Sequence, residues 1–168
     1  WIGRVQCSES YKSANFRGSR KEPFSGGSMN VSMVTTGFYR GSRPEGDTDL
    51  FTIKSQGVVT DLSLETGFGA WWDRVCGRGF DEKSAWGQYW KGVFISRPCS
   101  NISPPTPAET NDILAIIERS IPGGVFLHCY SGVDRTGWIV AAWRVTREGV
   151  APEAAWQEAV TMGMHWRF

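Results

Sequence analysis

Apolar and polar positions along the chain form two kinds of pattern. Short, continuously apolar runs are typical of buried strands, and apolar residues three or four positions apart are typical of helices that pack on one face. The expected strands lie at 37–40, 58–64, 92–96 and 125–128. The expected helices lie at 47–57, 106–120, 136–149 and 151–163.

The helix over 106–120 has the clearest start signal. Thr106 is suited to the N-cap, Pro107 to the first helical position, and Glu109 completes a capping box. Isoleucines at 113, 116 and 117 then form one apolar face. The pattern ends near Ser120, before a Pro-Gly-Gly sequence that favours a turn.

Two stretches lack a sustained period. Residues 1–36 are rich in Ser, Gly, Lys and Arg and predict an N-terminal arm or irregular extension. Residues 65–91 carry five glycines and predict loops with about one helical turn. Tryptophans 71, 72, 86 and 90 of this stretch are expected in the core, with the wall of a substrate cleft as the alternative.

The order of these elements predicts the fold class. Strands that alternate with helices are typical of an α/β fold with a mainly parallel sheet. A chain of 168 residues suits one such domain, with helices flanking a central sheet. We therefore expect one catalytic domain over residues 37–168, preceded by the arm over residues 1–36.

Composition narrows the class of protein. With 40% hydrophobic and 21% charged residues the chain is typical of a soluble globular domain, and a net charge of +1 argues against a general nucleic-acid binder. No apolar run is long enough to span a membrane. The four cysteines form no C-x-x-C pair, so no metal site is expected. A cytoplasmic protein is expected, and export stays open because the sequence begins at Trp1.

The sequence HCYSGVDRTG, residues 128–137, carries the candidate chemistry. It joins an expected strand to an expected helix, a junction where backbone N–H groups and the helix dipole bind anions. Cys129 lies at the floor of this loop, where a helix N-terminus and a cation favour the nucleophilic thiolate. Arg135 can hold two phosphate oxygens with its planar guanidinium, and the Thr136 hydroxyl can donate to the sulfur. His128 is expected to point away from the floor and to support the loop, as strand alternation requires.

These residues resemble the signature H-C-x-x-G-x-x-R-[ST]-G of the cysteine-dependent protein tyrosine phosphatase superfamily, with Gly132 and Gly137 in place. GFYRGSRP at 37–44, GVVTDLSLE at 57–65 and the helix pair after the loop resemble segments of dual-specificity-like bacterial phosphatases. The resemblance implies a metal-independent phosphatase without a cofactor, acting on a phosphorylated protein or a small phosphomonoester through a cysteinyl-phosphate. It also implies a phosphate site in which the loop amides hold the equatorial oxygens: Tyr130, Ser131, Gly132, Val133, Asp134 and Arg135.

One element of the resemblance is missing. Relatives supply a general acid from a separate loop ahead of the cysteine, and the corresponding FISRPCSNIS contains no acidic residue. Asp134 is the best replacement as the acid, and the alternative is that it only supports the loop through backbone N–H groups. Glu109 and Asp112 are further candidates, with capping the expected role of Glu109.

Other residues near these motifs receive weaker roles. Arg40 and Arg43 are expected at the surface or in structural ion pairs, Arg97 is a candidate for contacting substrate, and His165 is expected to pack or cap. Asp61 is expected to form hydrogen bonds at a strand end.

Three functions remain open at this point. Phosphotyrosine hydrolysis, with phosphoserine and phosphothreonine as further substrates, leads. A phosphoinositide or inositol-phosphate phosphatase is the alternative within catalysis, although Val133 stands where such relatives carry lysine. A non-catalytic phospho-binding module is the alternative outside it. The sequence leaves the oligomeric state open.

Overall fold

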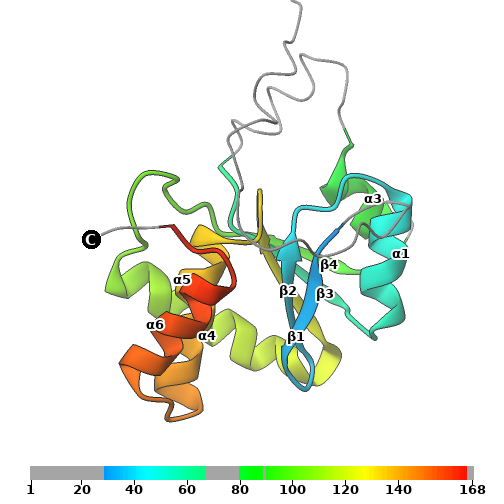
Figure 1. Cartoon of the computed structure of the whole chain (residues 1–168). Helices are drawn as coiled ribbons and strands as arrows, with labels where there is room; N and C mark the ends of the chain where they lie inside the picture. Colours follow the sequence, from blue (N-terminus) through cyan, green and yellow to red (C-terminus); the bar gives the residue numbers. More distant parts are fainter. Residues whose placement is uncertain (1–28, 67–79, 89, 166–168) are drawn as a thin grey trace, which may run out of the picture.

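A central sheet of five strands organises the computed structural model, which describes residues 29–66, 80–88 and 90–165 (Figure 1). The strands are β1 (Val31–Thr35), β2 (Phe38–Ser42), β3 (Thr60–Ser63), β4 (Val93–Ser96) and β5 (Val125–Cys129). Their order is β1-β2-β5-β3-β4, with β1 antiparallel to β2 and the remaining pairs parallel. The predicted single α/β domain with a mainly parallel sheet is confirmed.

Helices cover both faces of the sheet, as parallel strands require. Figure 1 shows α4, α5 and α6 on one face and α1 and α3 on the other. The bounds are α1 Asp47–Ser55, α3 Glu82–Gln88, α4 Pro107–Ser120, α5 Asp134–Arg147 and α6 Pro152–Thr161, with a short 3-10 turn at Ile121–Gly123. No described helix combines the length and the apolar character that crossing a bilayer requires.

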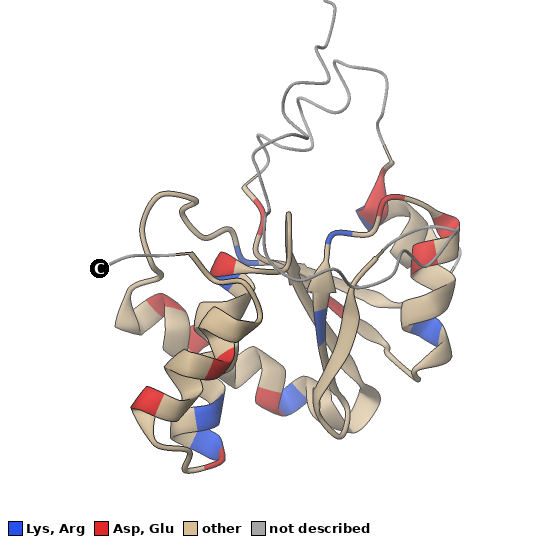
Figure 2. Cartoon of the chain, viewed as in Figure 1, with Lys and Arg blue, Asp and Glu red and all other residues tan. Residues whose placement is uncertain are grey.

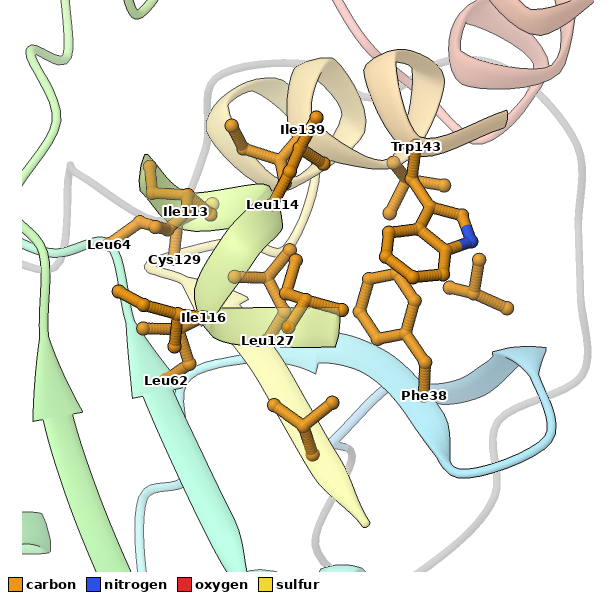
Figure 3. Close-up of a cluster of buried hydrophobic side chains, with 14 of the residues drawn as sticks. Phe38, Leu62, Leu64, Ile113, Leu114, Ile116, Leu127, Cys129, Ile139 and Trp143 are labelled. Carbon is orange, nitrogen blue, oxygen red and sulfur yellow. The ribbon is translucent and has the colours of Figure 1, made fainter. Parts of the chain in front are cut away.

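Strand alternation divides the core into two clusters. The larger lies under α4 and α5, where Phe38 packs edge-on against Trp143 at a ring separation of 5.4 Å (Figure 3). The smaller lies under α1 and α3 and contains Phe126 and Trp86. Trp86 is fully buried and donates from its indole nitrogen to the Val59 carbonyl, so its predicted core role is confirmed. Tryptophans 71 and 72 lie outside the described residues.

The predicted helix start at Thr106 is confirmed in detail. The Thr106 hydroxyl accepts from the backbone N–H of Glu109, and the Glu109 carboxylate accepts from the backbone N–H of Thr106. The carboxylate also accepts from the Thr106 hydroxyl, and this bond together with the one from the Thr106 N–H holds the pKa of Glu109 below its usual value. The carboxylate is therefore committed to capping, as the sequence predicted.

Two elements differ from the sequence-based expectation. Residues 31–35, which fall within the expected arm, form β1 and pair with β2. This edge strand is mostly half-buried and lacks a clear apolar alternation, so its sequence carried little signal. Helix α3 occupies seven residues of a stretch expected to be mostly loop. The rest of the arm, up to residue 28, lies outside the described residues.

Charged residues are distributed over the helices without a surface of one sign. Figure 2 shows acidic and basic positions interspersed on the helices of both faces. Several pair locally, such as Arg144, which contacts Glu148 and Glu158.

Candidate active site

The segment between β5 and α5 forms the loop that the sequence singled out. Strand β5 ends at Cys129 and α5 begins at Asp134, so the loop turns within four residues. Gly132 adopts φ +71°, and a Cβ there would lie 2.3 Å from the carbonyl oxygen of Gly41 on β2. Only glycine satisfies both the left-handed backbone and this close approach. The loop therefore rests directly on the neighbouring strand.

Arg40 fixes the loop from below. Its Nη2 atom donates to the carbonyl oxygen of Gly132 at 2.7 Å, and the residue is only 4% exposed. The expected surface or ion-pair role of Arg40 is therefore wrong, because strand alternation on β2 places this side chain on the face covered by α5. Burial lowers the pKa of the guanidinium, while the nearby Cys129 side chain acts in the opposite direction. Arg40 thus supplies positive charge behind the loop.

Cys129 lies where β5, the loop and the core meet. Its side chain faces the α4 and α5 side, beside Leu64 and Ile113, and the residue is 1% exposed (Figure 3). A charged sulfur in such a position needs compensation from nearby donors. The N-terminus of α5 and the guanidinium of Arg40 are the positive groups that the fold brings to this point.

Arg135 and Thr136 follow in the first turn of α5. The Arg135 Nη1 atom donates to the carbonyl oxygen of Leu64 at 3.1 Å, which holds the guanidinium at the carboxyl end of β3. The Thr136 hydroxyl is fully buried and has no hydrogen-bond partner among the described residues. Gly137 lies behind it, where a Cβ would meet the flexible side chain of Met164 at 3.3 Å.

The outer part of the loop faces solvent. Tyr130 is 47% exposed and Ser131 is exposed, while Val133 is partly buried. The guanidinium of Arg43 lies 5.0 Å from the centre of the Tyr130 ring and pairs with Glu65 at 3.5 Å. The expected ion-pair role of Arg43 is confirmed. This pair borders the mouth of the loop.

The carboxylate of Asp134 contacts the C-terminal segment. Its Oδ1 atom accepts from the backbone N–H of His165 at 2.7 Å, and the side chain is 32% exposed. The bond joins the residues after α6 to the first turn of α5. Because part of the carboxyl remains exposed, this contact leaves the predicted acid role and the supporting role both open.

The other acid candidates have structural partners. Asp112 forms an exposed ion pair with Arg97 at 2.8 Å, and Glu109 caps α4. Arg97 is thereby engaged by a helix residue, which favours a structural role over the expected contact with substrate. Cys99 is a buried thiol nearby, and burial raises its pKa to about 11, so it is neutral at physiological pH.

His128 lies on the face of the sheet opposite Cys129, as strand alternation predicted. Its ring is fully buried, and its Nδ1 atom lies 3.3 Å from the carbonyl oxygen of Cys129. Asp61 and Glu82 reach the other ring nitrogen, Nε2. Sequence reasoning missed Glu82 because an isolated acid in an irregular stretch carries no spacing signal. The same reasoning underestimated Asp61.

Comparison with solved structures identifies the fold of the chain. Solved structures with the same fold include P. aeruginosa TpbA, with 21% identity over 82% of this chain and 77% of TpbA, at a TM-score of 0.66. They also include Tk-PTP in its active form, with 17% identity over 79% of this chain and 84% of that one, at 0.63. A third is the core catalytic domain of the PP-IP phosphatase SIW14 from S. cerevisiae, with 17% identity over 79% and 74%, at 0.64. The fold is therefore that of the protein tyrosine phosphatases.

The family follows from the sequence match. Residues 13–165 match the PTP-NADK family, described as a DSP-PTPase phosphatase fused to NAD+ kinase. The chain belongs to this family of cysteine-based, dual-specificity-type phosphatases, as the resemblance in the sequence implied. No curated protein sequence gives a match.

We predict that Gly132→Ala destabilises the protein and abolishes anion binding by the loop. A left-handed backbone costs a non-glycine residue about 1–2 kcal/mol, and the contact with Gly41 adds overpacking of about 1–3 kcal/mol. Urea unfolding measures the loss. Gly46→Ala is the control, because nothing lies within 4 Å of a Cβ there and the backbone is extended. Equal stability of both variants would show that the loop relaxes away from β2.

We also predict that Arg40→Met slows alkylation of Cys129 by iodoacetamide at about pH 6.5 by about tenfold, because a nearby cation favours the thiolate. In Arg40→Lys the rate of alkylation should lie between those of the unchanged protein and Arg40→Met, since lysine keeps the charge but not the forked geometry of the guanidinium. Mass spectrometry of the Cys129 peptide separates this thiol from the others. Arg97→Met, which removes an exposed cation, should leave the rate unchanged. A parent-like rate in Arg40→Met would exclude the electrostatic role.

Proposed function

We propose that the protein is a phosphatase that hydrolyses phosphotyrosine, and with it phosphoserine and phosphothreonine, through a cysteinyl-phosphate at Cys129. The observation that carries the proposal is the loop geometry. Gly132, held against β2, turns the chain so that the end of β5 and the start of α5 meet at one point. Anions bind at such a junction, and the thiol stands at its floor.

The first step transfers the phosphoryl group to sulfur. The Cys129 thiolate attacks phosphorus, the S–P bond forms, and the bond from phosphorus to the leaving oxygen breaks. Arg135 and the amides of 130–135 stabilise the equatorial oxygens, which is where preorganised donors contribute most. Asp134 donates a proton to the leaving oxygen, which departs as an alcohol or a phenol.

The second step restores the enzyme. Asp134, now a carboxylate, takes a proton from water as the water attacks phosphorus. The S–P bond breaks, inorganic phosphate leaves, and the thiolate returns. The buried Thr136 hydroxyl, which has no partner among the described residues, is suited to donate to the departing sulfur. Division of one difficult displacement into two is the general advantage of covalent catalysis.

The loop favours substrates with one phosphoryl group. Arg135 is its only cation, and Val133 occupies a position where a second cation would help to hold a polyphosphate. The exposed Tyr130 ring at the mouth, backed by Arg43, offers a flat apolar surface for the phenyl group of a phosphotyrosine. A solved structure of a Cys-to-Ser variant of TpbA holds pTyr, which supports the same choice here.

We predict that the chain hydrolyses an aryl phosphate between about pH 5 and 7 and that Cys129→Ser abolishes turnover, because the serine hydroxyl is a far weaker nucleophile than a thiolate. Release of phosphate from phosphopeptides and from inositol phosphates, measured side by side, tests the substrate class. Cys99→Ser is the control, since that thiol is neutral and buried. Binding of a phosphopeptide without turnover would support a non-catalytic binding module instead. Faster release of phosphate from inositol phosphates than from phosphopeptides would support the alternative of a phosphoinositide or inositol-phosphate phosphatase.

A separate prediction concerns the general acid. Asp134→Asn should slow hydrolysis of an alkyl phosphate by about 10²-fold or more, because an alkoxide needs a proton in order to leave. Hydrolysis of a nitrophenyl phosphate should change much less. His165→Gly keeps the backbone N–H that contacts Asp134 and is the control for the C-terminal contact. Equal slowing of both substrates would assign Asp134 to support of the loop.

A further inference from the structure

Three ionisable side chains are buried together beneath the catalytic loop, on the face of the sheet opposite the thiol. They are Asp61 on β3, Glu82 at the start of α3 and His128 on β5. His128 and Asp61 are fully buried, and Glu82 is 9% exposed. The Nε2 atom of His128 lies 3.1 Å from Glu82 Oε1 and 3.3 Å from Asp61 Oδ1. The steps proposed above use none of the three carboxyl or ring groups directly.

The sheet register explains how these residues meet. Asp61 pairs with Phe126 across parallel strands, and Ser63 pairs with His128, so the side chains of Asp61 and His128 share the face under α1 and α3. The rings of Phe126 and His128 stack at 5.6 Å, which fixes the plane of the imidazole. Helix α3 then brings Glu82 over the ring.

The geometry around the ring favours its charged form. Nδ1 lies 3.3 Å from the Cys129 carbonyl oxygen, which can only accept, and Nε2 faces carboxyl oxygens. Between the Cys129 carbonyl and an ionised Asp61, a neutral imidazole with its one N–H would leave a lone pair against an acceptor, whereas an imidazolium carries an N–H on both nitrogens. The charged form of His128 thus places an N–H toward the Cys129 carbonyl oxygen and an N–H toward the carboxyl oxygens of Asp61 and Glu82.

The carboxyl groups must also share a proton. One imidazolium between two carboxylates would leave a net negative charge buried below an anion site, which is costly. Burial raises the pKa of Glu82 to about 7, while His128 opposes this shift. Burial alone would lower the pKa of His128, but the charges of Glu82 and Asp61 outweigh it and raise that pKa well above its usual value. With Glu82 protonated, the cluster is neutral.

We propose that Glu82 is a positioning residue for the catalytic loop. Together with Asp61 it holds His128 as an imidazolium that fixes the Cys129 carbonyl, and its own proton keeps the cluster neutral while a dianion binds above. This inference rests on the proposed phosphate site. Among the described residues, Glu65, which pairs with Arg43, is a further charged group that interacts with His128 and Glu82, and it stays unchanged in the test below.

Loss of the Glu82 proton has a defined direction. The pKa of this carboxyl is 4.5 in an exposed chain and about 7 in the fold, so its contribution to stability is full below about pH 4.5 and is lost as pH rises through about 7. Over the same range a negative charge appears beneath the loop and repels a bound dianion. Glu82→Gln puts a neutral amide in place of the protonated carboxyl group, so that the side chain at this position no longer titrates.

The experiment measures binding of sulfate, which stays dianionic throughout, to the full chain in a Cys129→Ser background, so that no thiol titrates in the site. Calorimetry from pH 5.5 to 8.5 should show affinity falling by about fivefold through pH 7, the size expected for one buried charge at moderate distance. When Glu82→Gln is added to the Cys129→Ser background, the affinity for sulfate should change little between pH 5.5 and 8.5. Glu153→Gln, which changes an exposed glutamate on α6, should keep it.

Several outcomes would overturn the inference. The same pH dependence with and without Glu82→Gln would do so, as would the absence of sulfate binding at pH 5.5. Nitrogen-15 NMR of His128 in the unmutated chain gives a test that does not depend on the folding of Glu82→Gln. A neutral His128 ring at pH 6.5 would also exclude the proposed imidazolium. Stoichiometric zinc that is lost in Glu82→Gln would show a metal in place of the protons. Sulfate binding needs no turnover, so a chain that fails to hydrolyse phosphates can still confirm this role.

Discussion

The contact between the catalytic loop and strand β2 is the constraint on which the rest of the site depends. Gly132 lies so close to the backbone of Gly41 that it tolerates no side chain, and Arg40 holds Gly132 through its carbonyl oxygen. This contact sets the turn that directs the N-terminus of α5 at the end of β5. Without it, Cys129 and Arg135 would be near in sequence but not arranged around one anion. The cation that makes the contact also compensates charge behind the sulfur.

Strand alternation places the neighbouring side chains of His128 and Cys129 on opposite faces of the sheet, in different electrostatic environments. Cys129 faces α4 and α5 with Arg40, whereas His128 faces α1 and α3 with two carboxyl groups. The sheet thereby keeps the buried acids on the face opposite the Cys129 thiol. At the same time, the backbone between the two residues links both sides, because the His128 ring contacts the Cys129 carbonyl. The loop is consequently supported by hydrogen bonds from both faces of the sheet.

The departure from the usual acid loop has a structural counterpart. The segment after β4 carries Arg97, which pairs with Asp112 on α4, and it contains no acidic residue where the resemblance to dual-specificity-like phosphatases predicts one. The carboxyl of Asp134 lies instead at the start of α5, tied to the C-terminal segment through His165. Membership of a dual-specificity-type phosphatase family thus coexists with a different placement of acidic groups. The fold is shared with solved structures, while the substrate has to be argued from this chain's own residues.

The sequence by itself determined the fold class, most strands and helices, and the loop between β5 and α5, because these depend on local periodicity, caps and the spacing of a short motif. It also placed His128 on the far side from the thiol, which follows from alternation alone. Only the tertiary structure decided the roles of Arg40 and Glu82. Both are isolated charges whose burial depends on which distant segment covers them, and no local pattern encodes that. Strand β1 escaped prediction for a related reason, since an edge strand is held by its neighbour's backbone more than by its own side chains.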